Sequence, residues 1–260
     1  MTNQPMAKHQ PSQNKPFEGV FMELSNRWHS IAKSFSDFLE LVVSSFSQDE
    51  EKYKEVSSKY NKDELELFTK ALAELVLLME QKPDNRIDIL WEFYEKYISL
   101  GHNWQFFTPE VITDFMAQIT CIDGWYDTFC DENEKASIKN KQKSVCDPCC
   151  GSGRMLLSLS KRLWNNKRKY YYYWADLDRT CCLMCLINLF LNWVDWEIYH
   201  MNSLSFETYD AWAFWLKYWI IPYVVRMNLW TEIVKNKIEK IAREQKEMLQ
   251  SKDLKQGSLF

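Results

Sequence analysis

A glycine loop and two acidic residues mark the part of the sequence that could carry chemistry. Gly151 and Gly153, two of only 6 glycines in the chain, lie in the segment Asp147-Pro-Cys-Cys-Gly-Ser-Gly153. A strand is expected before this loop and a helix after it, so glycine would let the backbone approach a ligand near free helical N–H groups. The next expected strand ends in Ala175-Asp176-Leu177-Asp178. In nucleotide-binding sheets an acidic residue at that place binds the ribose hydroxyls.

The glycine loop and the acidic end of the next strand, in this order, together predict an adenosine-type ligand. The loop does not match Gly-x-Gly-x-x-Gly, which disfavours a dinucleotide, and no Gly-Lys-Ser/Thr follows, which disfavours a phosphate loop of the Walker type. Asp147 in the loop and Asp178 after the next strand each have an alternative role. Asp147 could cap the helix that follows the loop, and Asp178 could either bind the ribose or cap its own helix.

Strands and helices alternate around this loop. Strands are expected at Ser144–Cys146, Tyr170–Ala175 and Glu197–His200, and helices at Arg154–Trp164 and Thr180–Trp193. This order predicts a parallel α/β sheet. Two further helices are expected, one from Thr108-Pro109 to about Ile119 and one at Leu229–Gln250.

The first hundred residues read as helical. Apolar residues at helical spacing predict one helix over Phe17–Phe46, a second capped by Asp63, and a third over Ile87–Leu100. Such a unit is typical of a packing or dimer module. The predicted organisation is a disordered arm (1–16), a helical subdomain (17–100), an α/β domain (101–226), a C-terminal helix (227–250) and a flexible tail (251–260).

Composition restricts the class of protein. Of the 260 residues 46% are hydrophobic and 26% charged, which is typical of a globular chain. The net charge of −4 means that any DNA contact must come from local basic patches. Two such runs could contact phosphates, although they are equally typical of solvated surface: Lys139, Lys141 and Lys143, and Lys161, Arg162, Lys167, Arg168 and Lys169.

The cysteines and apolar runs give no sign of a metal or a membrane. Cys181-Cys182-x-x-Cys185 lacks a second ligand pair at zinc spacing, so buried thiols are favoured and no metal is expected. The N-terminal residues show no secretory signal, which predicts a cytoplasmic protein of a bacterium or a phage-infected host. The apolar run Ala211–Val225 is short and contains Lys217, so a buried element is favoured over a membrane span.

Four motifs in order carry a family resemblance: Gln105-Phe-Phe-Thr-Pro109, Asp147-Pro-Cys-Cys-Gly-Ser-Gly-Arg-Met-Leu156, Ala175-Asp-Leu-Asp178 and His200-Met-Asn-Ser-Leu204. Over approximately residues 100–205 the chain resembles the N6-adenine DNA methyltransferases of the type I restriction-modification class. The resemblance implies a Rossmann-like S-adenosylmethionine-dependent domain after a helical region. It also implies DNA as substrate, with a specificity subunit or a second copy of the chain as partner.

The resemblance also implies roles for individual residues. Phe107, Thr108 and Pro109 would line the methionine end of S-adenosylmethionine, although Phe106 and Phe107 could instead be core rings. Asp147, Gly151 and Gly153 would form the loop beneath it. Asp176 would bind the ribose, and Asn202 would lie near the adenine.

The family's Asn/Asp-Pro-Pro-Tyr/Phe motif is not intact. Its acceptors hold the exocyclic amine of adenine while its aromatic ring stacks on the flipped base. The nearest match is Ile220-Ile-Pro-Tyr223, in which Pro222 and Tyr223 agree but Ile220 cannot accept a hydrogen bond. A buried strand ending at Pro222 is the alternative. Two functions therefore compete, a DNA adenine-N6 methyltransferase and a catalytically degenerate cofactor- or DNA-binding module that acts through a partner. An unrelated α/β nucleotide binder is a third.

The last five residues, Gln256-Gly-Ser-Leu-Phe260, resemble the pentapeptide by which bacterial DNA-metabolism proteins bind the replicative sliding clamp. Leu259 and Phe260 would be apolar anchors, and Gln256 would hydrogen-bond at the edge of the pocket. Gly257 departs from the commonest form. A chance match of so short a pattern is the alternative.

Overall fold

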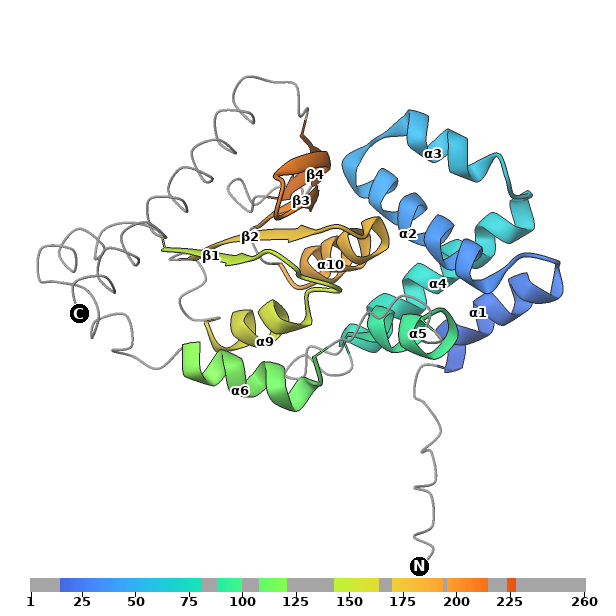
Figure 1. Cartoon of the computed structure of the whole chain (residues 1–260). Helices are drawn as coiled ribbons and strands as arrows, with labels where there is room; N and C mark the ends of the chain where they lie inside the picture. Colours follow the sequence, from blue (N-terminus) through green and yellow to red (C-terminus); the bar gives the residue numbers. More distant parts are fainter. Residues whose placement is uncertain are drawn as a thin grey trace, which may run out of the picture. The chain divides into compact units, whose positions relative to one another are not determined.

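The computed structural model describes residues 15–80, 88–99, 108–120, 143–163, 170–193, 196–214 and 224–227. The chain forms two compact units (Figure 1). One contains Met1–Val42 and Glu50–Phe106, and the other Val43–Asp49 and Phe107–Phe260. Each unit is described by itself below.

Helices make up the described part of the first unit. They are α1 (Lys15–Asn26), α2 (Ile31–Ser47), α3 (Glu50–Ser57), α4 (Lys62–Glu80) and α5 (Ile89–Tyr97), of which the end of α2 belongs to the second unit. A cluster of phenylalanine rings fills the core. The ring of Phe21 lies 5.2 Å from that of Phe17 and 4.7 Å from that of Phe93, and all three side chains are buried.

The single helix predicted over Phe17–Phe46 is wrong, because the chain breaks between α1 and α2. Trp28 adopts a left-handed backbone with φ of 71°, and the N–H groups of Trp28 and His29 donate to the carbonyls of Ser25 and Leu24. These bonds end α1 without interrupting the apolar spacing, so the sequence pattern conceals the break. Helix α1 also begins at Lys15, within the arm predicted for residues 1–16.

The start of α4 differs from the prediction as well. Asn61, not Asp63, caps it: the Asn61 side chain accepts from the Glu64 N–H at 3.0 Å, and Glu64 accepts in return from the Asn61 N–H. This reciprocal pair is a capping box. Helix α3 was not predicted because Val56 is its only buried residue, which leaves no apolar stripe. Helix α5 is capped by Asp88.

The second unit is built on a mixed sheet in the order β1-β2-β3-β4-β5. The strands are β1 (Lys143–Asp147), β2 (Tyr170–Asp176), β3 (Trp196–Asn202), β4 (Glu207–Phe214) and β5 (Val224–Arg226). Strands β1, β2 and β3 run parallel, and β4 and β5 are antiparallel. The α/β class is confirmed. The sheet is not wholly parallel because the short turn between β3 and β4 reverses the chain.

Helices α9 (Arg154–Arg162) and α10 (Arg179–Leu191) lie on one face of this sheet, and α6 (Glu110–Thr120) lies against α9 (Figure 1). Both crossovers, from β1 to β2 and from β2 to β3, move in the same direction along the sheet, so a right-handed connection places both helices on the same side. Helix α10 is buried from Cys181 to Leu189, and it packs on β2 and β3. Of the run Ala211–Val225, the part in β4 is buried, as expected. None of the described helices is long and apolar enough to cross a membrane.

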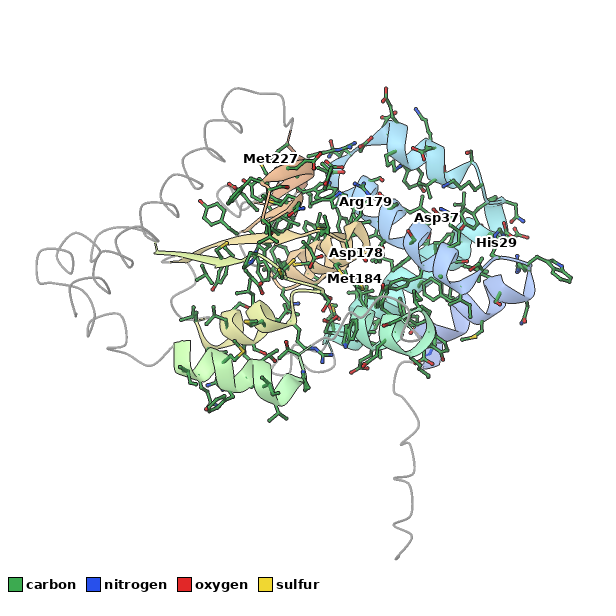
Figure 2. The ribbon with its side chains drawn as sticks, viewed as in Figure 1. His29, Asp37, Asp178, Arg179, Met184 and Met227 are labelled. Carbon is green, nitrogen blue, oxygen red and sulfur yellow. The ribbon has the colours of Figure 1, made fainter. Side chains whose placement is uncertain are left out.

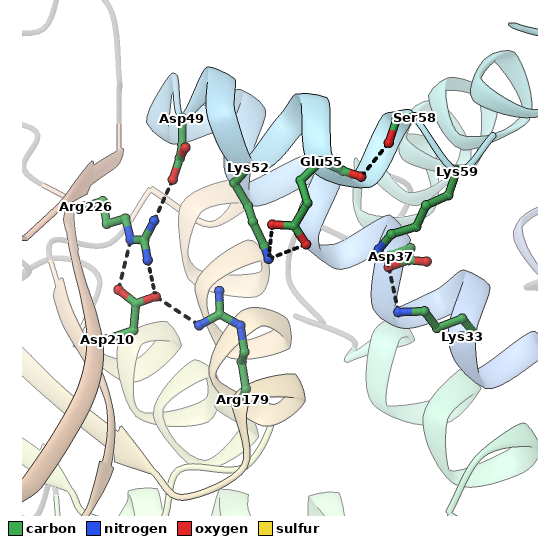
Figure 3. Close-up of polar contacts among 10 residues, drawn as sticks. All are labelled: Lys33, Asp37, Asp49, Lys52, Glu55, Ser58, Lys59, Arg179, Asp210 and Arg226. Atoms are coloured by element: carbon green, nitrogen blue, oxygen red, sulfur yellow. Dashed lines mark hydrogen bonds and ion pairs between the residues drawn. The ribbon is translucent and has the colours of Figure 1, made fainter. Parts of the chain in front are cut away.

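Ion pairs and hydrogen bonds join Arg179, the first residue of α10, to residues of β4 and β5 (Figure 3). The buried Asp210 carboxylate accepts from Arg179 Nη1 at 2.9 Å and from Arg226 Nε and Nη2 at 3.0 and 2.9 Å. Arg226 Nη1 also donates to Asp49 at 2.7 Å. The Arg179 guanidinium lies over the ring of Trp212. Two arginines thus compensate one buried carboxylate.

We expect Asp210→Ala to lower the free energy of unfolding by about 2–3 kcal/mol, because hydrogen bonds to charged groups are worth about 1.5–3 kcal/mol and the half-exposed arginines are partly screened. Denaturant unfolding measures the change. Glu207→Ala is the matched control, since Glu207 is an exposed carboxylate of the same strand that bonds only its neighbour Tyr209 among the described contacts. Equal stability of the two variants would contradict the role given to the network.

Candidate functional site

The carboxyl ends of the parallel strands bring three predicted site residues to one edge of the sheet. Asp147 ends β1, Asp176 ends β2 and Asn202 ends β3. Asp147 is in register with Trp174, and Asp176 with His200. Ligands of open α/β sheets bind at such an edge.

The Asp176 carboxylate joins the glycine loop to the end of β2. Its Oδ2 accepts from the Gly151 N–H at 2.8 Å and its Oδ1 accepts from the Asp178 N–H at 2.8 Å. The loop is also held by the Cys150 N–H, which donates to the Ala175 carbonyl at 2.9 Å. A carboxylate has about four lone-pair sites, so Asp176 keeps capacity to accept from a ligand hydroxyl beside its bonds to the backbone.

The two glycines have different reasons to be glycine. Both have positive φ, 54° at Gly151 and 86° at Gly153. A Cβ on Gly153 would lie 2.8 Å from Cys185 Sγ and 3.5 Å from a ring carbon of Trp174. Gly153 is therefore required by the close approach of the loop to α10 and β2, whereas Gly151 presents its N–H to Asp176.

We expect Gly153→Ala to destabilise the protein by about 2–5 kcal/mol, from left-handed backbone strain of about 1–2 kcal/mol and overpacking of about 1–3 kcal/mol. Gly19→Ala is the opposite control, since Gly19 lies within α1 with nothing near its Cβ position, and it should gain about 0.5–1 kcal/mol. Both changes are read by denaturant unfolding.

Adding Cys185→Ala to Gly153→Ala should relieve the clash but not the strain. The double variant should therefore lose less stability than the sum of the two single variants. Strict additivity would show that Cys185 does not oppose a side chain at position 153.

Asp147 forms a turn and does not cap the helix after the loop. Its Oδ1 accepts from the Cys149 N–H at 3.1 Å, while the N-cap of α9 is Gly153, which has no side-chain bond. Burial raises the pKa of Asp147, and the nearby charge of Asp176 raises it further. Burial is also the main cause that raises the pKa of Asp176, against the backbone N–H bonds that lower it.

The raised pKa of Asp147 gives a pH-dependent prediction. A carboxyl whose pKa is higher in the folded than in the unfolded state stabilises the fold at low pH, and loses that contribution as pH rises through the folded pKa. Asp147→Asn keeps an oxygen for the Cys149 N–H without the charge. The variant should therefore gain stability relative to wild type as pH rises from about 3 to about 7.

Free energies of unfolding of both proteins across this range give the comparison, and taking their difference cancels most other titrating groups. An advantage of Asp147→Asn that shrinks with rising pH would contradict the assignment.

Asp178 caps its own helix, which is one of the two roles predicted for it. It is the N-cap of α10, and its side chain accepts from the Thr180 N–H at 2.7 Å. Figure 2 shows Asp178 and Arg179 together at the start of this helix. The cap bond uses Oδ1 of Asp178, whereas the carboxylate that bonds the glycine loop is that of Asp176.

The turn after β3 meets the glycine loop. Ser203 Oγ donates to the Pro148 carbonyl at 2.6 Å. Asn202 Oδ1 accepts from the N–H groups of Leu204 and Ser205, at 3.0 and 3.2 Å, and so shapes this turn. Sequence reasoning missed Ser203, although its hydroxyl lies inside the fourth motif.

A second missed residue is Asn188, whose Nδ2 donates to the Ser152 carbonyl of the loop at 2.9 Å. It is fully buried in α10. A single amide in an otherwise apolar helix was the available signal, because a buried amide needs a partner.

Thr108 and Pro109 were also predicted to line the site. Thr108 and Pro109 precede α6, and the Pro109 carbonyl accepts from the Thr113 N–H at 3.1 Å. Thr113 in turn lies 3.2 Å from Ser158 of α9, hydroxyl to hydroxyl. The other predicted site residues lie outside the described residues: Phe107, Pro222, Tyr223, Gln256, Leu259 and Phe260.

The described cysteines are free thiols. Cys150, Cys181, Cys182 and Cys185 are buried, and Cys146 and Cys149 are exposed. Burial raises the pKa of Cys185 to about 11. Within the described residues no three His, Cys, Asp or Glu side chains form a group that could hold a metal ion.

The sequence is similar to known proteins over much of its length. The model of the N-6 DNA Methylase family matches residues 85–218, which is more than half of the chain. The chain belongs to the N-6 DNA Methylase family. A relative in this comparison is the type I restriction enzyme MpnII methylase subunit of Mycoplasma pneumoniae, which is 27% identical over 160 residues. That match covers 57% of this chain and 27% of the relative, so the chain spans about a quarter of the relative's length.

Two solved structures resemble this member of the N-6 DNA Methylase family in part. One, from Listeria monocytogenes, is assigned as a class I S-adenosylmethionine-dependent methyltransferase; the match has a TM-score of 0.43 and 16% identity over 74% of this chain and 55% of that one. The other is the type I restriction-modification methyltransferase subunit of Streptococcus thermophilus, with a TM-score of 0.32 and 15% identity over 72% of this chain and 38% of that one.

Proposed function

We propose that the chain binds S-adenosylmethionine at the carboxyl edge of β1, β2 and β3, and acts as a DNA adenine-N6 methyltransferase or as a subunit of one. The hydrogen bond between the Gly151 N–H and Asp176 is the observation that carries the proposal. It joins the two motifs that would hold adjacent parts of one ligand, the methionine part and the ribose. Membership of the N-6 DNA Methylase family supports the same cofactor and the same reaction.

The residues at this edge fit the cofactor. Asp176 keeps carboxylate lone pairs that would accept from the ribose hydroxyls, and the loop of Asp147, Gly151 and Gly153 would lie beneath the methionine part. Asn202 uses its oxygen within its own turn, so what it would offer the adenine is its amide nitrogen as a donor. Phe107, Thr108 and Pro109 would line the methionine end.

Two candidate functions remain, an active methyltransferase and a catalytically degenerate module. They differ in whether the chain supplies a hydrogen-bond acceptor for the adenine amine. The cofactor, when bound, supplies an electrophilic methyl group. Pro222 and Tyr223 would be the catalytic residues, with the Tyr223 ring stacking on the flipped base. Ile220 stands where the family has an amide or carboxylate acceptor, and this favours the second candidate, a degenerate module that holds cofactor or DNA for a partner.

We expect the pure protein to retain S-adenosylmethionine and to methylate mixed DNA weakly or not at all. Incubation with the methyl-labelled cofactor, followed by separate measurement of retained cofactor and labelled DNA, tests both. Asp176→Ala should weaken binding by about 1.5–3 kcal/mol, because it removes hydrogen bonds to a charged group.

Asp178→Asn is the matched control. It keeps the cap oxygen of α10 and should bind like wild type. Since Asp176 also holds the loop, thermal unfolding of each variant is measured in parallel. Absence of binding by wild type at millimolar cofactor would overturn the proposed function, and strong N6-methyladenine formation by the chain alone would overturn the degenerate candidate.

DNA and a further subunit are the proposed macromolecular partners, in the cytoplasm of a bacterium or a phage-infected host. Lys161 and Arg162 at the end of α9 are exposed and could contact phosphates. The relative from Mycoplasma pneumoniae is by name the methylase subunit of a type I restriction enzyme. A specificity subunit is accordingly the partner we propose first, and a second copy of this chain the next.

The sliding clamp is a further proposed partner, through Gln256, Leu259 and Phe260. Burial of the two apolar side chains is worth roughly 1.5–3 kcal/mol each before the tail is ordered, which predicts weak binding. Fluorescence polarisation with the host clamp should show binding by the full chain and none by a chain that ends at Lys255. Equal binding by both chains, or none by either, would remove this proposal.

A further inference from the structure

One histidine outside the predicted site contacts the turn that carries Asp176. His200 lies in β3, in register with Asp176 of β2. Its Nε2 lies 3.1 Å from the backbone carbonyl oxygen of Leu177. Leu177 separates Asp176 from Asp178 in the turn between β2 and α10.

The contact fixes the tautomer of the ring. A carbonyl oxygen only accepts, so Nε2 must carry the hydrogen. Nδ1 is buried and has no hydrogen-bond partner in the described part of the chain. A second proton there would be a buried donor without an acceptor, so the ring is held neutral. In agreement, burial and then the Arg179 guanidinium lower the pKa of His200, and they outweigh the hydrogen bond to the Leu177 carbonyl and the charges of Asp210 and Asp178, which raise it.

The peptide that His200 contacts is the one that holds the Asp176 carboxylate. The carbonyl of the Leu177–Asp178 peptide accepts from His200, and the N–H of the same peptide donates to Asp176 Oδ1. A peptide unit is planar and trans, so its C=O and N–H point in opposite directions. Fixing the carbonyl therefore fixes the direction in which the N–H meets Asp176.

The backbone and a neighbouring ring hold His200 in place for this bond. The pairing of β3 with β4 shifts its register between His200 and Met201. Such irregularities re-aim a side chain next to functional sites. The ring of Tyr209 lies 5.0 Å from that of His200, centroid to centroid.

We infer that His200 is a positioning residue, which orients the Leu177–Asp178 peptide and through it presents the Asp176 carboxylate to the ribose of the cofactor. The identity of the ligand in this inference rests on the proposed function, whereas the hydrogen bond of His200 to Leu177 does not depend on it. The neutral Nε2–H tautomer is the working form. Removal of the donor should loosen Asp176 without altering the residues that would contact the cofactor.

Two substitutions separate the donor from the bulk of the ring. His200→Leu removes the donor, whereas His200→Gln places an amide N–H near the position of Nε2. We expect His200→Leu to weaken S-adenosylmethionine binding by about three- to tenfold, the effect of one hydrogen bond, and His200→Gln to restore most of it. Tyr209→Phe keeps the ring beside His200 and should bind like wild type.

A double-variant cycle tests whether His200 acts through Asp176. The variant with both His200→Leu and Asp176→Ala should bind no more weakly than Asp176→Ala alone. An additive loss, or equal binding by the Leu and Gln variants, would overturn the positioning role.

Two measurements without cofactor keep this inference separate from the proposed function. Nitrogen-15 NMR of the free protein should show His200 with its hydrogen on Nε2, and amide exchange of Asp178 should be slow in wild type and His200→Gln but faster in His200→Leu. A hydrogen on Nδ1, or equal exchange in all three proteins, would overturn the inference even if the cofactor binds. Failure of wild type to bind cofactor, with these signatures present, would overturn only the proposed function.

Discussion

The candidate site depends first on the hydrogen bond between the Gly151 N–H and the carboxylate of Asp176, which joins the glycine loop to the end of β2. The parallel order of β1 and β2 places the glycine loop beside the end of the next strand, so segments 25 residues apart meet there. The same arrangement brings two acidic groups, Asp147 and Asp176, into a partly dehydrated place, and burial raises the pKa of both. Backbone N–H groups of the loop and of the turn before α10 offset part of that penalty.

The rigidity of this edge comes from the packing beneath it. Every residue of α10 from Cys181 to Leu189 is buried, and Cys185 lies so close to Gly153 that no Cβ fits between them. The glycine loop is therefore packed directly against the buried side chains of α10. Asn188 of the same helix bonds the Ser152 carbonyl, so one helix supports the loop both by contact and by hydrogen bond.

Much of the α/β unit could be predicted from the sequence, because its strands and helices each carry a distinct hydrophobic period between clear breaks. The ends of β2 and α10 fall within a few residues of the expected ranges. In the helical unit the same reasoning failed at Trp28, because a left-handed residue can end one helix while the apolar spacing continues into the next. It failed at Asn61 because Asn61 and Asp63 are both good caps, and only the bonds to Glu64 distinguish them. For the candidate site, motifs predicted which residues share the edge and gave the cap of α10 as one of two alternatives for Asp178, but not that Ser203 and His200 bond the neighbouring turns. Those bonds depend on backbone direction, which residue type does not encode.

The hydrogen bonds at this edge also bear on how cofactor binding and turnover can separate. They join residues of three short segments, 147–153, 176–178 and 200–205, to one another. The candidate acceptor position, Ile220, belongs to none of these segments. If Gly151 and Asp176 hold the cofactor and position 220 meets the adenine amine, as we propose, then cofactor binding and turnover depend on different segments of the chain. The sequence motifs for the cofactor can then be retained while the acceptor is replaced by Ile220.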